Sequence, residues 1–167
     1  MGIIIVIALR ILLPLTIFRW PLLGGFLSAL ADFFDFGILE KFGWDEIHSD
    51  EYQKMDKILD TFYLGIGFVA LRKLRDKLIT GTATLLFSWR LIGVAAFEIT
   101  GIRSFLFFAP NIFEGFFFLI FIARKFRFLP EIKNQNFFAF FILLSGIIKL
   151  LHEYKLHVGD LRDLLNF

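Results

Sequence analysis

The sequence predicts an all-α, polytopic membrane protein: a six-transmembrane-helix bundle with a short C-terminal amphipathic segment. Three observations support this fold class: 57% of the 167 residues are hydrophobic, 25 residues are phenylalanine, and the apolar residues fall in long runs. A soluble domain is closer to half apolar, and its apolar runs are shorter. We therefore expect a single integral membrane helical domain over residues 1–167, in contact with membrane lipids.

The first half of the chain holds three of the predicted spans. Residues 3–18 form a short apolar segment, because roughly 20 residues are needed to cross the hydrocarbon core, and Pro14 is expected to kink it. The chain then turns at Trp20, a residue type that favours the membrane interface. The second span covers residues 22–39 and the third covers residues 52–71, with an acidic loop between them.

The second half holds the other three predicted spans. They cover residues 79–99, 104–123 and 136–151, and basic clusters follow the third and fifth spans. Residues 160–167 carry leucines at helical spacing, which predicts a short helix lying in the interface.

The distribution of positive charge predicts the orientation. Six spans place both termini on one side, together with the acidic loop. The opposite side carries nine Lys and Arg, in short loops, against six on the side of the termini. Because positively charged loops stay in the cytoplasm, we expect both termini to be extracytoplasmic in the cell (plasma or inner) membrane.

Composition also excludes several classes of function. The chain has no cysteine, so it has no disulfide framework, thiolate metal site or cysteine nucleophile. A net charge of only +2 gives no reason to expect nucleic acid as a partner. The sequence is also compatible with a homo-oligomer.

The strongest polar feature is a set of four aspartates, here called the Asp quartet: Asp32, Asp35, Asp56 and Asp60. The pairs are spaced i,i+3 and i,i+4, so each pair shares one face of its helix. Folding the two helices back on each other near the acidic loop sets Asp35 level with Asp56, and Asp32 level with Asp60. The two levels are then separated by roughly 4.5–6 Å.

Four carboxylates at membrane depth need a cation, protons or basic partners. The leading hypothesis is a membrane-embedded cation-binding site, for a divalent ion (Mg, Mn or Ca) or for protons, in a protein of transport or ion binding. Arg10 is expected to pair with Asp32, and Glu98 is a further polar group on the same side. The alternative is a structural or accessory subunit whose aspartates form ion pairs with basic residues: Arg10, Lys54, Lys57 and Arg103.

A second polar group lies in the predicted fourth and fifth spans. Arg90 and Glu114 are level near mid-membrane, where isolated charges are costly, so they are expected to form a buried ion pair. Pro110 leaves the carbonyl of Leu106 without its helical donor, and Asn111 shares a face with Glu114. Such a broken helix suits an ion site in a transporter; the alternative is an ion pair that fixes helix registry.

The quartet resembles the signature of the CDP-alcohol phosphatidyltransferases, D-x2-D-G-x2-A-R-x8-G-x3-D-x3-D. Asp32-Phe-Phe-Asp35 resembles the first pair, and Asp56-Lys-Ile-Leu-Asp60 resembles the second. The resemblance implies six helices, a divalent metal held by the aspartates, a CDP-linked substrate and Asp60 as the catalytic base of a lipid phosphotransferase. The glycines of the motif are replaced by Phe36 and Tyr52, the Ala-Arg pair is absent, and the gap between the pairs is longer.

Overall fold

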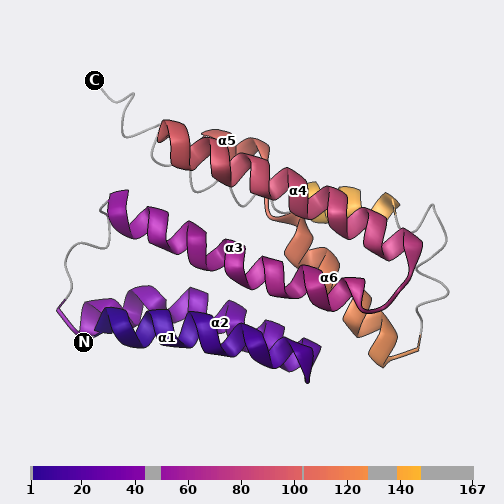
Figure 1. Cartoon of the computed structure of the whole chain (residues 1–167), viewed down its shortest axis with the longest axis horizontal. Coiled ribbons are helices and arrows are strands. Elements are labelled where there is room, and N and C mark those ends of the chain that lie inside the picture. The colour runs from indigo at the N-terminus through magenta and orange to yellow at the C-terminus, as the bar shows by residue number, and fades with distance from the viewer. Residues whose placement is uncertain (1, 44–49, 103, 128–138, 148–167) are drawn as a thin grey trace. The chain divides into compact units, whose positions relative to one another are not determined.

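The computed structural model describes residues 2–43, 50–102, 104–127 and 139–147 (Figure 1). These residues contain helices and no strand, which confirms the all-α prediction. The elements are α1 (Gly2–Leu15), the 3-10 turn η1 (Thr16–Phe18), α2 (Pro21–Lys41), α3 (Asp50–Arg72), α4 (Lys77–Thr100), α5 (Ser104–Phe108) and α6 (Ile112–Lys125). A further helical stretch covers residues 139–147.

In the described part of the chain, three helical segments are long and apolar enough to cross a membrane: Pro21–Lys41, Lys77–Thr100 and Ser104–Lys125. The first apolar helix, Gly2–Phe18, is shorter. Helix α3 has 23 residues, but six of its first eleven residues are charged, which lowers its hydropathy. Six spans are therefore not confirmed: the described residues contain three clear spans, which match the predicted second, fourth and fifth. The predicted sixth span (136–151) lies partly, and the tail (160–167) wholly, outside the described residues.

The chain divides into two compact units, residues 1–84 and 85–167, with α4 running through both. In the first unit α1 lies against α2 and α3 (Figure 1). Val6, Leu39 and Tyr52, one from each helix, form a buried cluster. The helices therefore alternate in direction, with the start of α1 beside the end of α2 and the start of α3.

A glycine allows the tight reversal between α1 and α2. Thr16 Oγ1 donates to the carbonyl of Leu13 at 2.6 Å, and Pro21 occupies the first turn of α2, where its missing N–H costs nothing. A side-chain carbon at Gly24 would lie 2.5 Å from the backbone nitrogen of Ile17. Only glycine lets α2 approach η1 this closely.

The second unit is rich in buried phenylalanine. Val94 and Phe97 of α4 pack on Leu106 of α5. Helix α6 buries Phe113, Phe116, Phe117 and Ile120. Pro110 separates α5 from α6, and Asn111 caps α6 by accepting the backbone N–H of Glu114 at 3.3 Å. The predicted break at Pro110 is confirmed.

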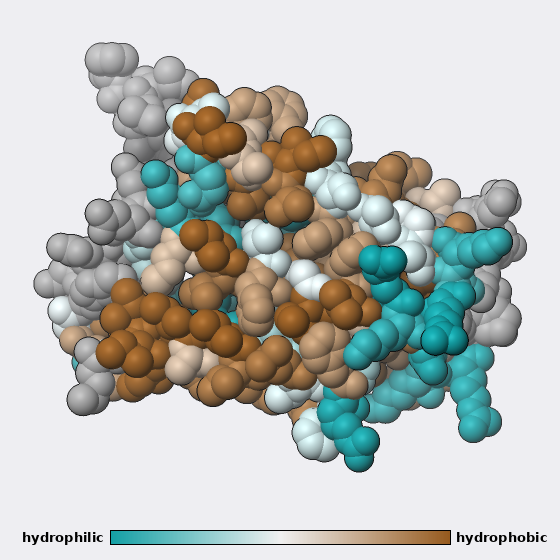
Figure 2. All heavy atoms as spheres, in the orientation of Figure 1, coloured by the Kyte–Doolittle hydropathy of each residue, from teal (hydrophilic) through white to brown (hydrophobic). Residues whose placement is uncertain are grey.

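Large apolar side chains also lie on the outside of both units and cover much of the face seen in Figure 2. In the first unit, Phe33, Ile4 and Leu12 are 77%, 69% and 61% exposed. In the second, Leu85, Ile92 and Ile99 are spaced seven residues apart along α4, and all three are exposed. Outward apolar stripes of this kind suit contact with lipid rather than water, and they are compatible with membrane insertion.

Candidate ion-binding site

The site is organised around Arg10, which lies on α1 and is only 5% exposed. One terminal nitrogen, Nη1, lies 2.7 Å from a carboxylate oxygen of Asp35 and 2.5 Å from one of Asp56. The other, Nη2, lies 2.6 Å from a carboxylate oxygen of Asp32 and also contacts Asp60. A single guanidinium thus joins all four carboxylates of the Asp quartet.

The helix spacing places the aspartates as the sequence predicts. Asp32 and Asp35 come from the second half of α2, and Asp56 and Asp60 come from the first half of α3. Nη1 binds the Asp35–Asp56 level and Nη2 binds the Asp32–Asp60 level. The predicted convergence and the pairing of levels are confirmed.

A second cation, Lys57, lies at the edge of the quartet. Its Nζ is 2.6 Å from a carboxylate oxygen of Asp56 and 3.4 Å from one of Asp60. With all groups ionised, the four carboxylates face two cations among the described residues, which leaves a formal charge of −2 for this part of the chain. Because the cluster is largely shielded from water, that excess is more costly than it would be on a surface.

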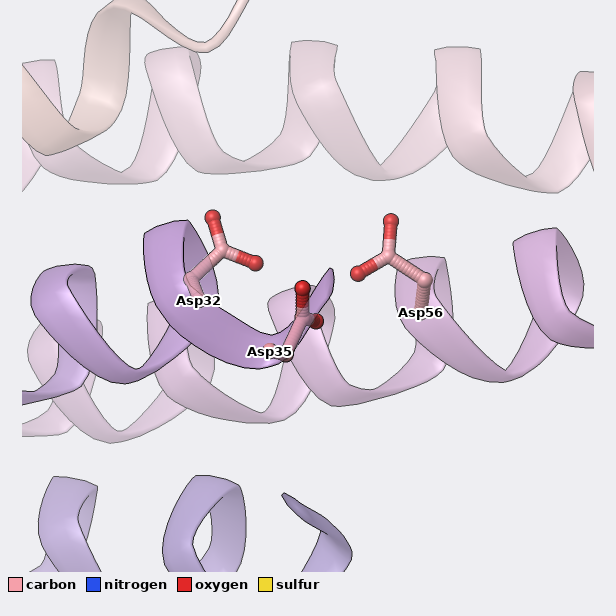
Figure 3. Close-up of side chains that lie close together, drawn as sticks. All are labelled: Asp32, Asp35 and Asp56. Atoms are coloured by element: carbon pink, nitrogen blue, oxygen red, sulfur yellow. The ribbon is translucent and has the colours of Figure 1, made fainter. Parts of the chain in front are cut away.

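Three of the carboxylates are close enough to share one ion. One oxygen each of Asp32, Asp35 and Asp56 lies within 4.8 Å of the others (Figure 3). The side chain of Asp32 is 48% exposed, whereas that of Asp35 is 4% exposed. The group therefore has one open side and one closed side. Carboxylate oxygens are the ligands that Mg²⁺, Mn²⁺ and Ca²⁺ prefer, so the residue types fit such an ion, in competition with Arg10.

The sequence predicted a pair between Arg10 and Asp32 and named Arg10 among four basic residues that could pair with the aspartates, but it did not predict that Arg10 contacts all four. The signal for the others was available, because a guanidinium has five donors and Arg10 is the only charged residue in the first apolar segment. Among the described residues, the ion pairs of the quartet use Arg10 and Lys57. Of the two other predicted partners, Lys54 is exposed and takes no part in these ion pairs, and Arg103 lies outside the described residues.

The second polar group forms around the break between α5 and α6. Arg90 is buried, and its Nη1 donates to the carbonyl of Ala109 at 2.8 Å and more distantly to that of Leu106 at 3.5 Å. Arg90 thus supplies a donor to the carbonyl that Pro110 was predicted to free. The amide of Asn111 donates to Glu114 at 3.3 Å, and the Arg90–Glu114 ion pair stays a prediction.

Glu98 lies two turns beyond Arg90 on α4, within the same unit. Its Oε1 and the Nε of Arg90 are both buried and have no hydrogen-bond partner among the described residues. Arg90 and Glu98 both lie in the second unit, whereas the Asp quartet lies in the first. The supporting role of Glu98 at the quartet therefore stays a prediction.

Comparison of the chain with known protein families, with curated proteins and with solved structures finds no match.

Proposed function

We propose that this chain is a small integral membrane protein that binds cations at the Asp quartet and works in ion binding or transport. The observation that carries the proposal is the imbalance of charge: among the described residues, four carboxylates converge on two cations in a largely buried cluster. A bound cation removes the excess negative charge. The proposed setting is a six-helix bundle with the quartet towards the extracytoplasmic side.

Two kinds of cation can neutralise the cluster. A divalent ion would use oxygens of Asp32, Asp35 and Asp56, entering from the exposed side at Asp32. It would have to share these carboxylates with Arg10, which acts as a tethered cation of the protein itself. Protons would neutralise single carboxylates without moving Arg10, in the way that intramembrane acids do in proton relays.

Direct titration separates these possibilities. Calorimetry with Mg²⁺, Mn²⁺ and Ca²⁺ is carried out on the purified protein, on Asp35→Asn and on Glu40→Gln, a matched charge removal on an exposed side chain of α2. We expect saturable binding by the wild type and by Glu40→Gln, and loss of binding by Asp35→Asn. Equal weakening in both variants would contradict a specific site.

The proton arm uses the same three proteins without divalent ions. Acid–base titration of the folded protein should show uptake of protons at a pH above the ordinary carboxyl range, and Asp35→Asn should reduce that uptake while Glu40→Gln should not. If the wild-type protein shows neither saturable metal binding nor this proton uptake, the proposed function is overturned.

A specific observation favours a second candidate, a structural or accessory subunit. Arg10 already contacts every carboxylate of the quartet, and such networks fix helix registry without taking up ions. Failure of both titrations would favour this candidate. Failure of the metal titration alone would also remove the lipid phosphotransferase, because its proposed chemistry needs a metal at the same carboxylates.

A further inference from the structure

We propose that the first unit binds the headgroups of anionic phospholipids through a cluster of exposed basic side chains, here called the basic end. The basic end consists of Arg19, Arg72, Lys73, Arg75 and Lys77. It lies at the opposite end of the helices from the loop between α2 and α3. It is separate from the Asp quartet and plays no part in the proposed cation binding.

Packing brings together two segments that are far apart in the sequence. The ammonium of Lys73, just after α3, lies 4.2 Å from the centre of the Phe18 ring in η1, a distance typical of a cation–π contact. The turn after η1 and the turn between α3 and α4 therefore lie side by side. Hydrophilic side chains gather over the α3–α4 turn in Figure 2, next to the apolar surface of the helices.

The backbone of the α3–α4 turn holds its basic residues outward. Arg75 adopts a left-handed conformation with φ of 55°, which reverses the chain after α3. Asp76 then caps α4 by accepting the backbone N–H of Ile79 at 3.1 Å. The one acidic residue of the turn is thus directed to the helix backbone.

The five cations are exposed, and none of the ion pairs between described residues involves them. Set against Asp76 alone, they give the end a formal charge of +4. Two of them, Arg72 and Lys73, contact aromatic rings instead of acids. The cluster lacks an acidic partner of matching charge within the described part of the unit.

The position along the helices identifies the partner. Helices α2 and α4, two of the candidate spans, begin at Pro21 and Lys77, so the basic end lies where these spans leave the hydrocarbon. Trp20 is 58% exposed at the same level, as expected for a residue at the headgroup region. Lipid phosphates lie at this depth, and clustered Lys and Arg beside a span attract anionic lipids.

The experiment uses Trp20 as the reporter in the full-length chain. Trp44→Phe and Trp89→Phe leave it as the only tryptophan, and the protein is reconstituted with brominated phosphatidylglycerol or brominated phosphatidylcholine, which quench tryptophan on contact. We expect phosphatidylglycerol to be preferred by about three- to ten-fold at low salt, with the preference falling towards one at high salt. The measurements at low and high salt are made on the protein whose basic end carries no substitution.

Two matched pairs of substitutions locate the effect. R75Q/K77Q removes two charges from the basic end, whereas K41Q/K54Q removes two exposed charges from the opposite end of the unit. R75Q/K77Q should lower the preference, and K41Q/K54Q should leave it unchanged. Soluble glycerol phosphate at constant ionic strength should not change the quenching.

Three results would overturn the proposal: no preference in the parent protein at low salt, equal loss in the two pairs, or displacement of the lipid by soluble glycerol phosphate. Asp35→Asn, which disrupts the proposed cation site, should keep the full lipid preference. The two proposals therefore fail independently.

Discussion

Arg10 loses its hydration on burial, and its guanidinium contacts four carboxylates instead of water. Arginine suits this place better than lysine, because its planar fork presents several donors in fixed directions, while an ammonium is a single compact charge. The geometry uses both terminal nitrogens, each shared between one carboxylate of α2 and one of α3. The side chain therefore ties three helices together at one point.

Replacing Arg10 tests this role. Arg10→Gln leaves Lys57 as the only cation that the described residues offer to the quartet. Removal of one partner from a buried ionic network costs about 3 kcal/mol or more. The pair with Asp32 should contribute least, because that side chain is half exposed. We expect a clear loss in the free energy of unfolding in detergent, and an intermediate loss for Arg10→Lys.

Arg19→Gln is the matched control, because Arg19 is exposed and should change stability by less than about 0.5 kcal/mol. Similar unfolding of Arg10→Gln and Arg19→Gln would show that the network contributes little. Restoration of stability in Arg10→Gln by adding Asp35→Asn would instead identify unpaired negative charge as the source of the loss.

For the individual residues of the site, the spacing of the aspartates within a helical hairpin predicted that the quartet converges. The i,i+3 and i,i+4 pairs fix which side chains share a face, and a helical hairpin fixes which are level. The four-fold role of Arg10 could not be fixed in the same way, because α1 can rotate about its axis without any change in its apolar pattern. Only packing against both α2 and α3 decides where the guanidinium points.

Among the helices, α2 offers a direct comparison of two glycines. A side-chain carbon at Gly24 would lie 2.5 Å from the nitrogen of Ile17 and 2.8 Å from the carbonyl carbon of Thr16, whereas one at Gly37 would meet nothing within 4 Å. A third contact, with Thr16 Oγ1 at 2.6 Å, involves a side chain, but the other two are with backbone, which cannot move aside cheaply.

We therefore expect Gly24→Ala to destabilise the protein by about 1–3 kcal/mol. Gly37→Ala should be neutral or stabilising by up to about 1 kcal/mol, because alanine favours helix more than glycine does. Thermal unfolding of both variants in the same detergent measures the difference. Equal effects of the two substitutions would contradict the close approach of α2 to η1.

The elements also show which sequence signals are reliable. The turn before Pro21 and the break at Pro110 were predicted, because proline acts locally on the backbone. Helix α3 was predicted as a span, yet its charged first half keeps it out of the clear candidates. The mean hydropathy of a helix counts every charged residue, whether or not that charge is paired inside the protein. A helix with internally paired charges therefore has a low mean hydropathy even where it can lie in the membrane.

For the whole molecule, charge predicts orientation: the basic end should face the cytoplasm and the quartet should lie towards the outside. Because the chain has no cysteine, single cysteines can report this directly. Lys41→Cys lies at the quartet end of α2, and Arg75→Cys lies at the basic end; both positions are exposed.

In intact cells, a membrane-impermeant maleimide should label Lys41→Cys at once and Arg75→Cys only after permeabilisation. The reverse pattern would place the quartet towards the cytoplasm and would favour the lipid phosphotransferase over transport. Labelling of both would contradict the presence of an odd number of spans between them. Sequence alone cannot decide this, because a single additional or missing span exchanges the two sides.

The separation in sequence between Arg10 and its partners has a consequence for biosynthesis. Arg10 is made first, and Asp35, Asp56 and Asp60 follow 25, 46 and 50 residues later. A lone arginine near the centre of a short apolar segment disfavours insertion by about 3 kcal/mol. The nascent α1 is thus poorly suited to enter the lipid by itself, and its stable integration should wait until the ribosome has delivered α3.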